Sequence, residues 1–331
     1  MNKRKTWTIA GILGLVALVI GGALVSLDTD EAAPSLVQYE AKYVDAGSML
    51  RFTETLASDA LEGRATGTRG NEAARDFLQK RFETLGLQML GDSFIHPFTA
   101  TPDTAGASLV NGANVVGLIK GESDGPVLLI TAHYDHLGIV NGEIYNGADD
   151  NASGTAALVD LAHYFSLHKP LHDIIFAALD GEEIGFLGAY ALMDDPSVPM
   201  SRVALNLNFD MVSRSEAGEL YVAGTFHTPE LLPLIERVAA EAPVKLIAGH
   251  DDPDLGKAED WTSQSDHSVF HEAGIPFLYF GVEDHPGYHT PSDDYANITP
   301  DFFARAGDTL VMAAIAADEE LDIIGGEKAA D

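Results

Sequence analysis

The stretch that decides the fold is VLLITAHYDH at residues 127–136, where an apolar run ends in two histidines and an aspartate. The same pattern recurs as IIFAALDGEE at 174–183 and as VALNLNFDM at 203–211. Apolar runs without polar alternation are typical of strands that are buried on both faces of a sheet. The three stretches therefore predict a buried sheet whose strands end in charged side chains.

Amphipathic segments separate the apolar runs along the chain. We expect strands at 115–119, 127–132, 174–179, 203–209, 220–223 and 277–280, and helices at 48–56, 70–85, 153–165, 231–242 and 302–317. This alternation predicts an α/β three-layer sandwich with a central mixed, mainly parallel β-sheet flanked by helices. Ligands bind such sheets beyond the carboxyl ends of the strands, which is where the unusual polar residues fall.

The composition excludes several functions. The chain has 331 residues with 19 Lys and Arg against 51 Asp and Glu, a formal net charge of −32. Nucleic acids and anionic membrane surfaces would repel such a protein, so neither is expected as a partner. The chain contains no cysteine. This excludes a disulfide scaffold, a thiolate zinc site and a cysteine nucleophile.

The N-terminal segment indicates export. Lys3, Arg4 and Lys5 precede an apolar run at 7–27, so residues 1–33 are expected to be a signal peptide or an N-terminal membrane anchor. Either would place the rest of the chain in the periplasm or outside the cell, with 7–27 as the inner-membrane anchor in the second case. We expect one domain over 34–331, with a loose lead-in at 32–44 and a helical segment at about 45–90.

The polar residues at the strand ends match the requirements of a two-metal hydrolase. Each motif alone has an ordinary explanation; the Asp-rich turn at 147–154, for example, could simply cap a helix. Together, two histidines and several carboxylates without a thiolate suit zinc or a similar divalent ion. Two ions need a bridging carboxylate, and a further carboxylate can act as the general base. In the pair Glu182 and Glu183, one side chain can ligate a metal while the other faces the water.

The motifs together resemble those of a known family. They are HYDH at 133–136, GADDNASG at 147–154, DGEEIGFLGA at 180–189, NFDM at 208–211 and YHTPSDD at 288–294. In this order they resemble the di-zinc aminopeptidases of metallopeptidase family twenty-eight, the group that includes aminopeptidase S and aminopeptidase Y. The segments 56–74 and 265–280 are also similar to exported members.

The resemblance implies two zinc ions as cofactors and assigns their ligands. Asp150 would bridge both ions, with Asp149 as the rival for that position. The remaining ligands would form two pairs, which are Glu183 with His289 and His133 with Asp210.

The resemblance also implies roles in catalysis. Glu182 would be the general base that activates a hydroxide bridging the two ions. Asp135 would orient His133 through its other ring nitrogen. Tyr288 resembles a tyrosine that stabilises the oxyanion in some members, while other members use a tyrosine from elsewhere.

The expected activity is hydrolysis of the N-terminal peptide bond of peptides or proteins. Carboxypeptidases and dipeptidases with the same fold are the first alternative. Glutaminyl cyclases, which share the architecture but use one zinc, are the second, although His133 together with Asp210 favours two ions. A receptor-type binding domain that has lost its ligands is disfavoured, because every expected ligand is present.

Overall fold

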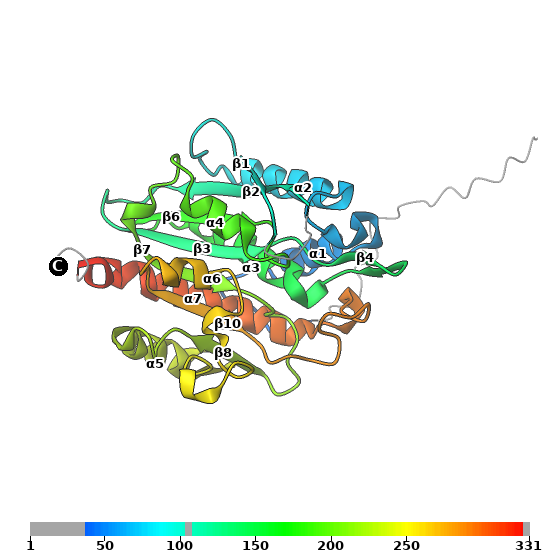
Figure 1. The fold of residues 1–331 in the computed structure, drawn as a ribbon. Helices are drawn as coiled ribbons and strands as arrows, with labels where there is room; N and C mark the ends of the chain where they lie inside the picture. Colours follow the sequence, from blue (N-terminus) through cyan, green and yellow to red (C-terminus); the bar gives the residue numbers. More distant parts are fainter. Residues whose placement is uncertain (1–36, 103–107, 327–331) are drawn as a thin grey trace, which may run out of the picture. The chain divides into compact units, whose positions relative to one another are not determined.

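The fold is built on a single large sheet in the computed structural model, which describes residues 37–102 and 108–326 (Figure 1). The predicted signal or anchor at 1–33, with its apolar run at 7–27, lies outside these residues. The sheet has eight strands in the order β1-β2-β6-β3-β7-β10-β8-β9. Their bounds are β1 Ile95–Ala100, β2 Val110–Ile119, β3 Val127–His133, β6 Asp173–Leu179, β7 Val203–Phe209, β8 Glu219–Ala223, β9 Lys245–Ala248 and β10 Phe277–Gly281.

The four central strands β6, β3, β7 and β10 run parallel to one another. Antiparallel pairs lie towards the edges, where β1 pairs with β2, β2 with β6, and β10 with β8. The predicted mixed, mainly parallel sheet is therefore present. Because the central strands are parallel, their carboxyl ends meet at one edge.

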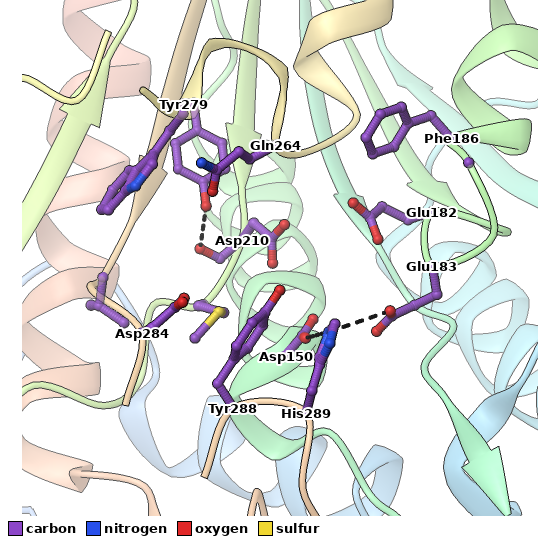
Figure 2. Close-up of a pocket in the computed structure, with 14 residues that line it drawn as sticks. Asp150, Glu182, Glu183, Phe186, Asp210, Gln264, Tyr279, Asp284, Tyr288 and His289 are labelled. Atoms are coloured by element: carbon purple, nitrogen blue, oxygen red, sulfur yellow. Dashed lines mark hydrogen bonds and ion pairs between the residues drawn. The ribbon is translucent and has the colours of Figure 1, made fainter. Parts of the chain in front are cut away.

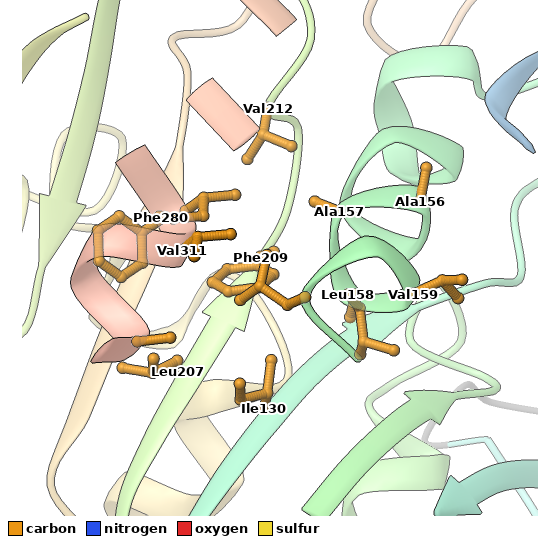
Figure 3. Close-up of a cluster of buried hydrophobic side chains, with 14 of the residues drawn as sticks. Ile130, Ala156, Ala157, Leu158, Val159, Leu207, Phe209, Val212, Phe280 and Val311 are labelled. Atoms are coloured by element: carbon orange, nitrogen blue, oxygen red, sulfur yellow. The ribbon is translucent and has the colours of Figure 1, made fainter. Parts of the chain in front are cut away.

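Helices cover both faces of this sheet and complete the predicted three layers. Their bounds are α1 Ala46–Leu56, α2 Arg69–Leu85, α3 Gly154–Leu167, α4 Leu187–Met193, α5 Leu232–Glu241, α6 His267–Glu272 and α7 Pro300–Gly326. Successive strand residues point to opposite faces. Leu128 and Ile130 therefore pack in the larger core with α1, α2, α3, α5 and α7, whereas Leu129 packs with α4 and α6. Figure 3 shows part of the larger core, where Ile130 and Phe209 lie between α3 and α7.

Some short elements were not predicted from the sequence. They are β1, β9, α4, α6 and the hairpin of β4 (Gly138–Val140) with β5 (Glu143–Tyr145). The longest of them has seven residues, which is too few for a periodic pattern to stand out. In β1, Pro97 also interrupts the strand signal. These elements depend on tertiary packing more than on their own sequence.

The lead-in is held more firmly than its composition suggests. Residues 37–44 form neither helix nor strand, yet they dock on α7 through the buried carboxylate of Asp308. This carboxylate accepts hydrogen bonds from the Tyr39 hydroxyl at 2.8 Å and from the backbone N–H groups of Lys42 at 2.7 Å, Tyr43 at 2.8 Å and Val44 at 3.0 Å. The expectation of a loose segment is therefore wrong for 39–44, because two acidic side chains of the distant helix α7 accept its backbone N–H groups: Asp301 accepts that of Tyr39, and Asp308 accepts the other three.

Among the described residues, none of the helices combines the length and the apolar character that a membrane span requires.

Replacing Asp308 by Ala tests this anchor. The substitution leaves three backbone donors and one hydroxyl without their acceptor, so we expect the free energy of unfolding to fall by about 3 kcal/mol. Urea denaturation measures the change. Glu319→Ala, which removes an exposed acid from the same helix, is the matched control and should change stability little. Equal stabilities of the two variants would contradict this account.

Candidate active site

The site forms where the central parallel strands end. β3 ends at His133, the loop after β6 carries Glu182 and Glu183, and Asp210 follows β7. The turn before α3 adds Asp150, and the loop after β10 adds Tyr288 and His289. Except for the buried His133, these side chains line a pocket of about 310 Å³ (Figure 2). These residues come from five separate loops or strand ends, and the first and last of them, His133 and His289, are 156 positions apart in the chain. The fold thus brings them together at one site.

The two carboxylate oxygens of Asp150 face different histidines. Asp150 Oδ1 lies 3.3 Å from His133 Nε2, while Oδ2 lies 3.1 Å from His289 Nε2. His133 Nε2 is also 3.3 Å from Asp210 Oδ1, and His289 Nε2 is 3.4 Å from Glu183 Oε2. Asp150 therefore stands between two groups of donor atoms, which are the same two pairs that the resemblance implied.

Asp149, the rival for the bridging position, is turned away from these groups. Its Oδ1 accepts hydrogen bonds from the backbone N–H and the hydroxyl of Ser213, both at 2.7 Å. Its Oδ2 lies 3.2 Å from Nε2 of His285. Asp149 thus joins three loops behind the site. The backbone N–H groups of Asp149 and Asp150 both donate to the Asp293 carboxylate at 2.9 Å, which fixes the turn that separates their two side chains.

His136 is a site residue that the sequence reasoning did not single out. Its Nδ1 lies 2.6 Å from Glu183 Oε1, and burial lowers the pKa of its imidazole to about 4. The ring is therefore neutral at physiological pH, the form in which histidine binds metals. His136, Asp150 and Glu183 together form one group of potential metal ligands, and His133, Glu182 and Asp210 form another. The sequence feature that could have identified His136 is its position as the second histidine of the HYDH motif at 133–136.

The electrostatics of the site call for a bound cation. Burial raises the pKa of Glu182 and Glu183 well above the usual value and also raises that of Asp210. Within the described residues, no lysine or arginine lines the pocket. Burial alone would lower the pKa of His133, but the neighbouring Asp210 and Glu182 outweigh it and raise that pKa. The negative electrostatic field that retains a proton on His133 also attracts a metal ion. Imidazole nitrogens together with carboxylate oxygens form a donor set that fits zinc.

Asp135 positions two of these groups. Nδ1 of His133 donates to the backbone carbonyl of Asp135 at 3.2 Å and lies 3.6 Å from its carboxylate. This arrangement leaves Nε2 of His133 free to face Asp150 and Asp210. The Asp135 carboxylate instead accepts the backbone N–H of Glu182 at 3.1 Å and the Thr66 hydroxyl at 3.1 Å. Asp135 therefore orients His133 chiefly through its backbone, and it holds the Glu182 backbone through its side chain.

Two tyrosines lie at the pocket. The Tyr279 hydroxyl donates to the backbone carbonyl of Asp210 at 3.4 Å. The Tyr288 hydroxyl points toward Asp210 in Figure 2 and has no hydrogen-bond partner within the described ranges. Burial raises the pKa of both phenols, so both keep their protons. Tyr288 is accordingly the tyrosine with a free donor at the pocket.

A buried arginine holds the loops that carry the ligands. Arg64 lies in the segment between α1 and α2, and its guanidinium is completely buried. It donates to four backbone carbonyls, which are those of Leu56 at 2.6 Å, Tyr134 at 2.8 Å, Asn146 at 2.6 Å and Gly147 at 3.0 Å. Tyr134 follows His133 directly, and Gly147 begins the turn that leads to Asp150. The sequence reasoning quoted this segment as family-like without assigning the arginine a role.

Gly147 is required in this turn for steric reasons. Its φ is +55°, and a Cβ there would lie 2.0 Å from the Asp150 carbonyl oxygen and 2.5 Å from the His136 ring. Any other residue would displace a ligand or its neighbour.

Replacing Arg64 by Met tests the role of the guanidinium. The variant keeps the apolar stem but removes the guanidinium hydrogen bonds to four buried carbonyls, so we expect a loss of stability of about 3 kcal/mol or more. Zinc affinity should fall as well, because the loop after His133 and the turn before Asp150 lose their anchor. Thermal unfolding and zinc titration measure the two effects. Arg69→Met, at an exposed arginine in α2, is the control; native stability and zinc affinity in Arg64→Met would contradict the assignment.

Comparisons with known proteins find a family profile, related sequences and related structures. The profile of Peptidase family M28 matches residues 114–314. Aminopeptidase YwaD from Bacillus subtilis is 33% identical over 213 residues, which make up 61% of this chain and 44% of that protein. The chain thus spans less than half the length of this relative.

Two solved structures share the fold. An aminopeptidase from Aneurinibacillus sp. strain AM-1 superposes with a TM-score of 0.67 at 16% identity, over 82% of this chain and 93% of the other. A glutaminyl cyclase from Porphyromonas gingivalis also gives a TM-score of 0.67, at 21% identity, over 82% of this chain and 98% of the other. The fold alone therefore does not separate these two activities.

Proposed function

The chain belongs to Peptidase family M28, and on this basis we propose that it is an exported aminopeptidase that works with two zinc ions. The observation that carries the proposal is the position of Asp150 between His133 and His289, with one carboxylate oxygen facing each. A carboxylate shared in this way is what a pair of metal ions requires. Asp210 on the side of His133 and Glu183 on the side of His289 would complete the two ligand sets.

Bound zinc would supply Lewis acidity, which polarises the scissile carbonyl and lowers the pKa of bound water. Glu182 has the position and the chemistry of a general base. It lines the same pocket, it belongs to the ligand group of His133 and Asp210, and Asp135 fixes its backbone. Its raised pKa suits a group that takes a proton from water and returns it to the leaving amine. The free hydroxyl of Tyr288 would donate to the carbonyl oxygen as negative charge develops there.

The proposed substrate is a peptide or protein with a free N-terminus. A strongly acidic pocket favours a cationic amino end over a C-terminal carboxylate, which the same carboxylates would repel. Export through residues 1–33 is part of the proposal. It predicts that N-terminal sequencing of the protein from the cell envelope or medium finds either cleavage near residue 33 or an intact anchor; full-length protein confined to the cytoplasm would contradict export.

Replacing Glu182 by Gln should abolish catalysis without removing the metal. The amide keeps the size of the side chain but cannot accept a proton, so we expect kcat to fall at least about a hundredfold. Metal analysis of the same preparation should still find the wild-type zinc content. Hydrolysis that survives in this variant with all its metal bound would refute the role of Glu182.

The number of ions can be tested by removing one histidine at a time. Wild-type protein should bind two equivalents of zinc, whereas His133→Ala and His289→Ala should each retain about one, because they remove ligands from different sides of Asp150. Elemental analysis after dialysis measures this. His163→Ala, in α3 and outside the pocket, is the control. One equivalent in the wild type would instead favour a site of the glutaminyl cyclase type.

A substrate panel separates the alternatives. We expect hydrolysis of aminoacyl p-nitroanilides and of C-terminally amidated peptides, no hydrolysis of N-acetylated peptides, and loss of activity with a chelator. Cleavage of N-acetylated peptides at the C-terminus would favour a carboxypeptidase. Release of ammonia from peptides that begin with glutamine would favour a cyclase.

A further inference from the structure

Asp284 is a carboxylate of the pocket wall that the proposed chemistry does not use. It lies in the loop between β10 and Tyr288, it is exposed, and Figure 2 shows its side chain directed into the pocket. In the part of the chain that the structure describes, no lysine, arginine or histidine forms an ion pair with it. Its neighbours are engaged elsewhere, since Glu283 lies 3.1 Å from His250 Nε2 and His285 lies 3.2 Å from the Asp149 carboxylate.

The charge balance of the pocket isolates this carboxylate further. Five acidic side chains line the pocket: Asp150, Glu182, Glu183, Asp210 and Asp284. In the proposed enzyme, the four positive charges of two zinc ions offset the first four of these. Asp284 is then the acidic side chain of the pocket whose negative charge is not offset by a metal ion. A positively charged group of the substrate would offset it.

Apolar side chains form part of the same pocket wall. Met211, Trp261 and Val282 line the same pocket, and all three are largely buried. One face of the Trp261 ring is covered by His250, which stacks on it with a centroid distance of 3.9 Å. A pocket that offers both apolar side chains and a carboxylate without a cationic partner matches a long aliphatic stem that ends in a cation. Lysine and arginine have this form, because they bury their methylene groups and keep the charge at the tip.

We propose that Asp284 is a specificity-determining residue that makes the enzyme prefer substrates whose first residue is lysine or arginine. This inference rests on the proposed aminopeptidase function and names its substrate class. The carboxylate would receive the ammonium or guanidinium group, while Met211, Trp261 and Val282 contact the stem.

The α-amino group of the substrate is the other cation that Asp284 could bind. These two assignments make different predictions, because every aminopeptidase substrate carries the α-amino group and only basic residues carry the second charge. Norleucine has the same chain length as the lysine stem without the charge, and it is therefore the matched neutral probe.

The test compares kcat/KM for the p-nitroanilides of lysine, arginine, norleucine and leucine in wild type and Asp284→Asn. We expect wild type to prefer lysine over norleucine by roughly tenfold, the size of one charge-assisted hydrogen bond. Asp284→Asn should remove this preference by lowering the values for lysine and arginine, and it should leave norleucine and leucine within about twofold. Zinc content should equal that of the wild type. Glu283→Gln, at the exposed neighbouring acid outside the pocket lining, should keep the preference.

Two results would overturn the assignment of Asp284. One is equal kcat/KM for lysine and norleucine in the wild type, and the other is an equal loss for all four substrates in Asp284→Asn, which would place the α-amino group at this carboxylate. A protein that cleaves none of the four p-nitroanilides but does cleave N-acetylated peptides would refute the aminopeptidase function itself. The two failures are therefore distinguishable.

Discussion

The buried guanidinium of Arg64 is the interaction on which the rest of the site depends. Loops that follow two different secondary-structure elements must approach within hydrogen-bonding distance of each other, and their inward-facing carbonyls need donors. One planar side chain with five N–H groups supplies them. Arg64 lies ahead of the region that matches the family profile, at 114–314. The catalytic architecture therefore extends into the helical segment before the sheet, and a fragment limited to the matched region would lack its central support.

A second constraint is the concentration of negative charge beside Asp150. Burying several carboxylates together is unfavourable unless a cation shares the site. The carboxylates are nevertheless buried together at the strand ends, because the parallel arrangement of β6, β3 and β7 brings Glu183, His133 and Asp210 to the same edge of the sheet. The large acidic excess of the whole chain is a separate matter. Only a few of its carboxylates belong to this site.

The sequence predicted the central strands well, since long apolar runs such as 127–132 and 203–209 have no other stable location than a buried sheet. It also predicted which side chains would meet, because parallel strands align their carboxyl ends. It could not separate Asp149 from Asp150 by pattern, because that choice depends on hydrogen bonds that Ser213 donates and that the Asp293 carboxylate accepts. Nor does the local sequence indicate that His172 is buried against Asp318. Such contacts join residues that are 64 to 146 positions apart, and they leave no local periodicity in the sequence.

The contact between His285 and Asp149 has a consequence for how this enzyme can change. It connects the loop that carries Asp284, Tyr288 and His289 to the turn that carries Asp150. The proposed wall for the substrate side chain and the metal-ligand candidate His289 therefore lie on one loop that contacts the turn of Asp150. Insertions or exchanges that reshape this loop for a new substrate would disturb metal retention as well. Exchange of single side chains, with the loop backbone left in place, would change the substrate wall without this disturbance.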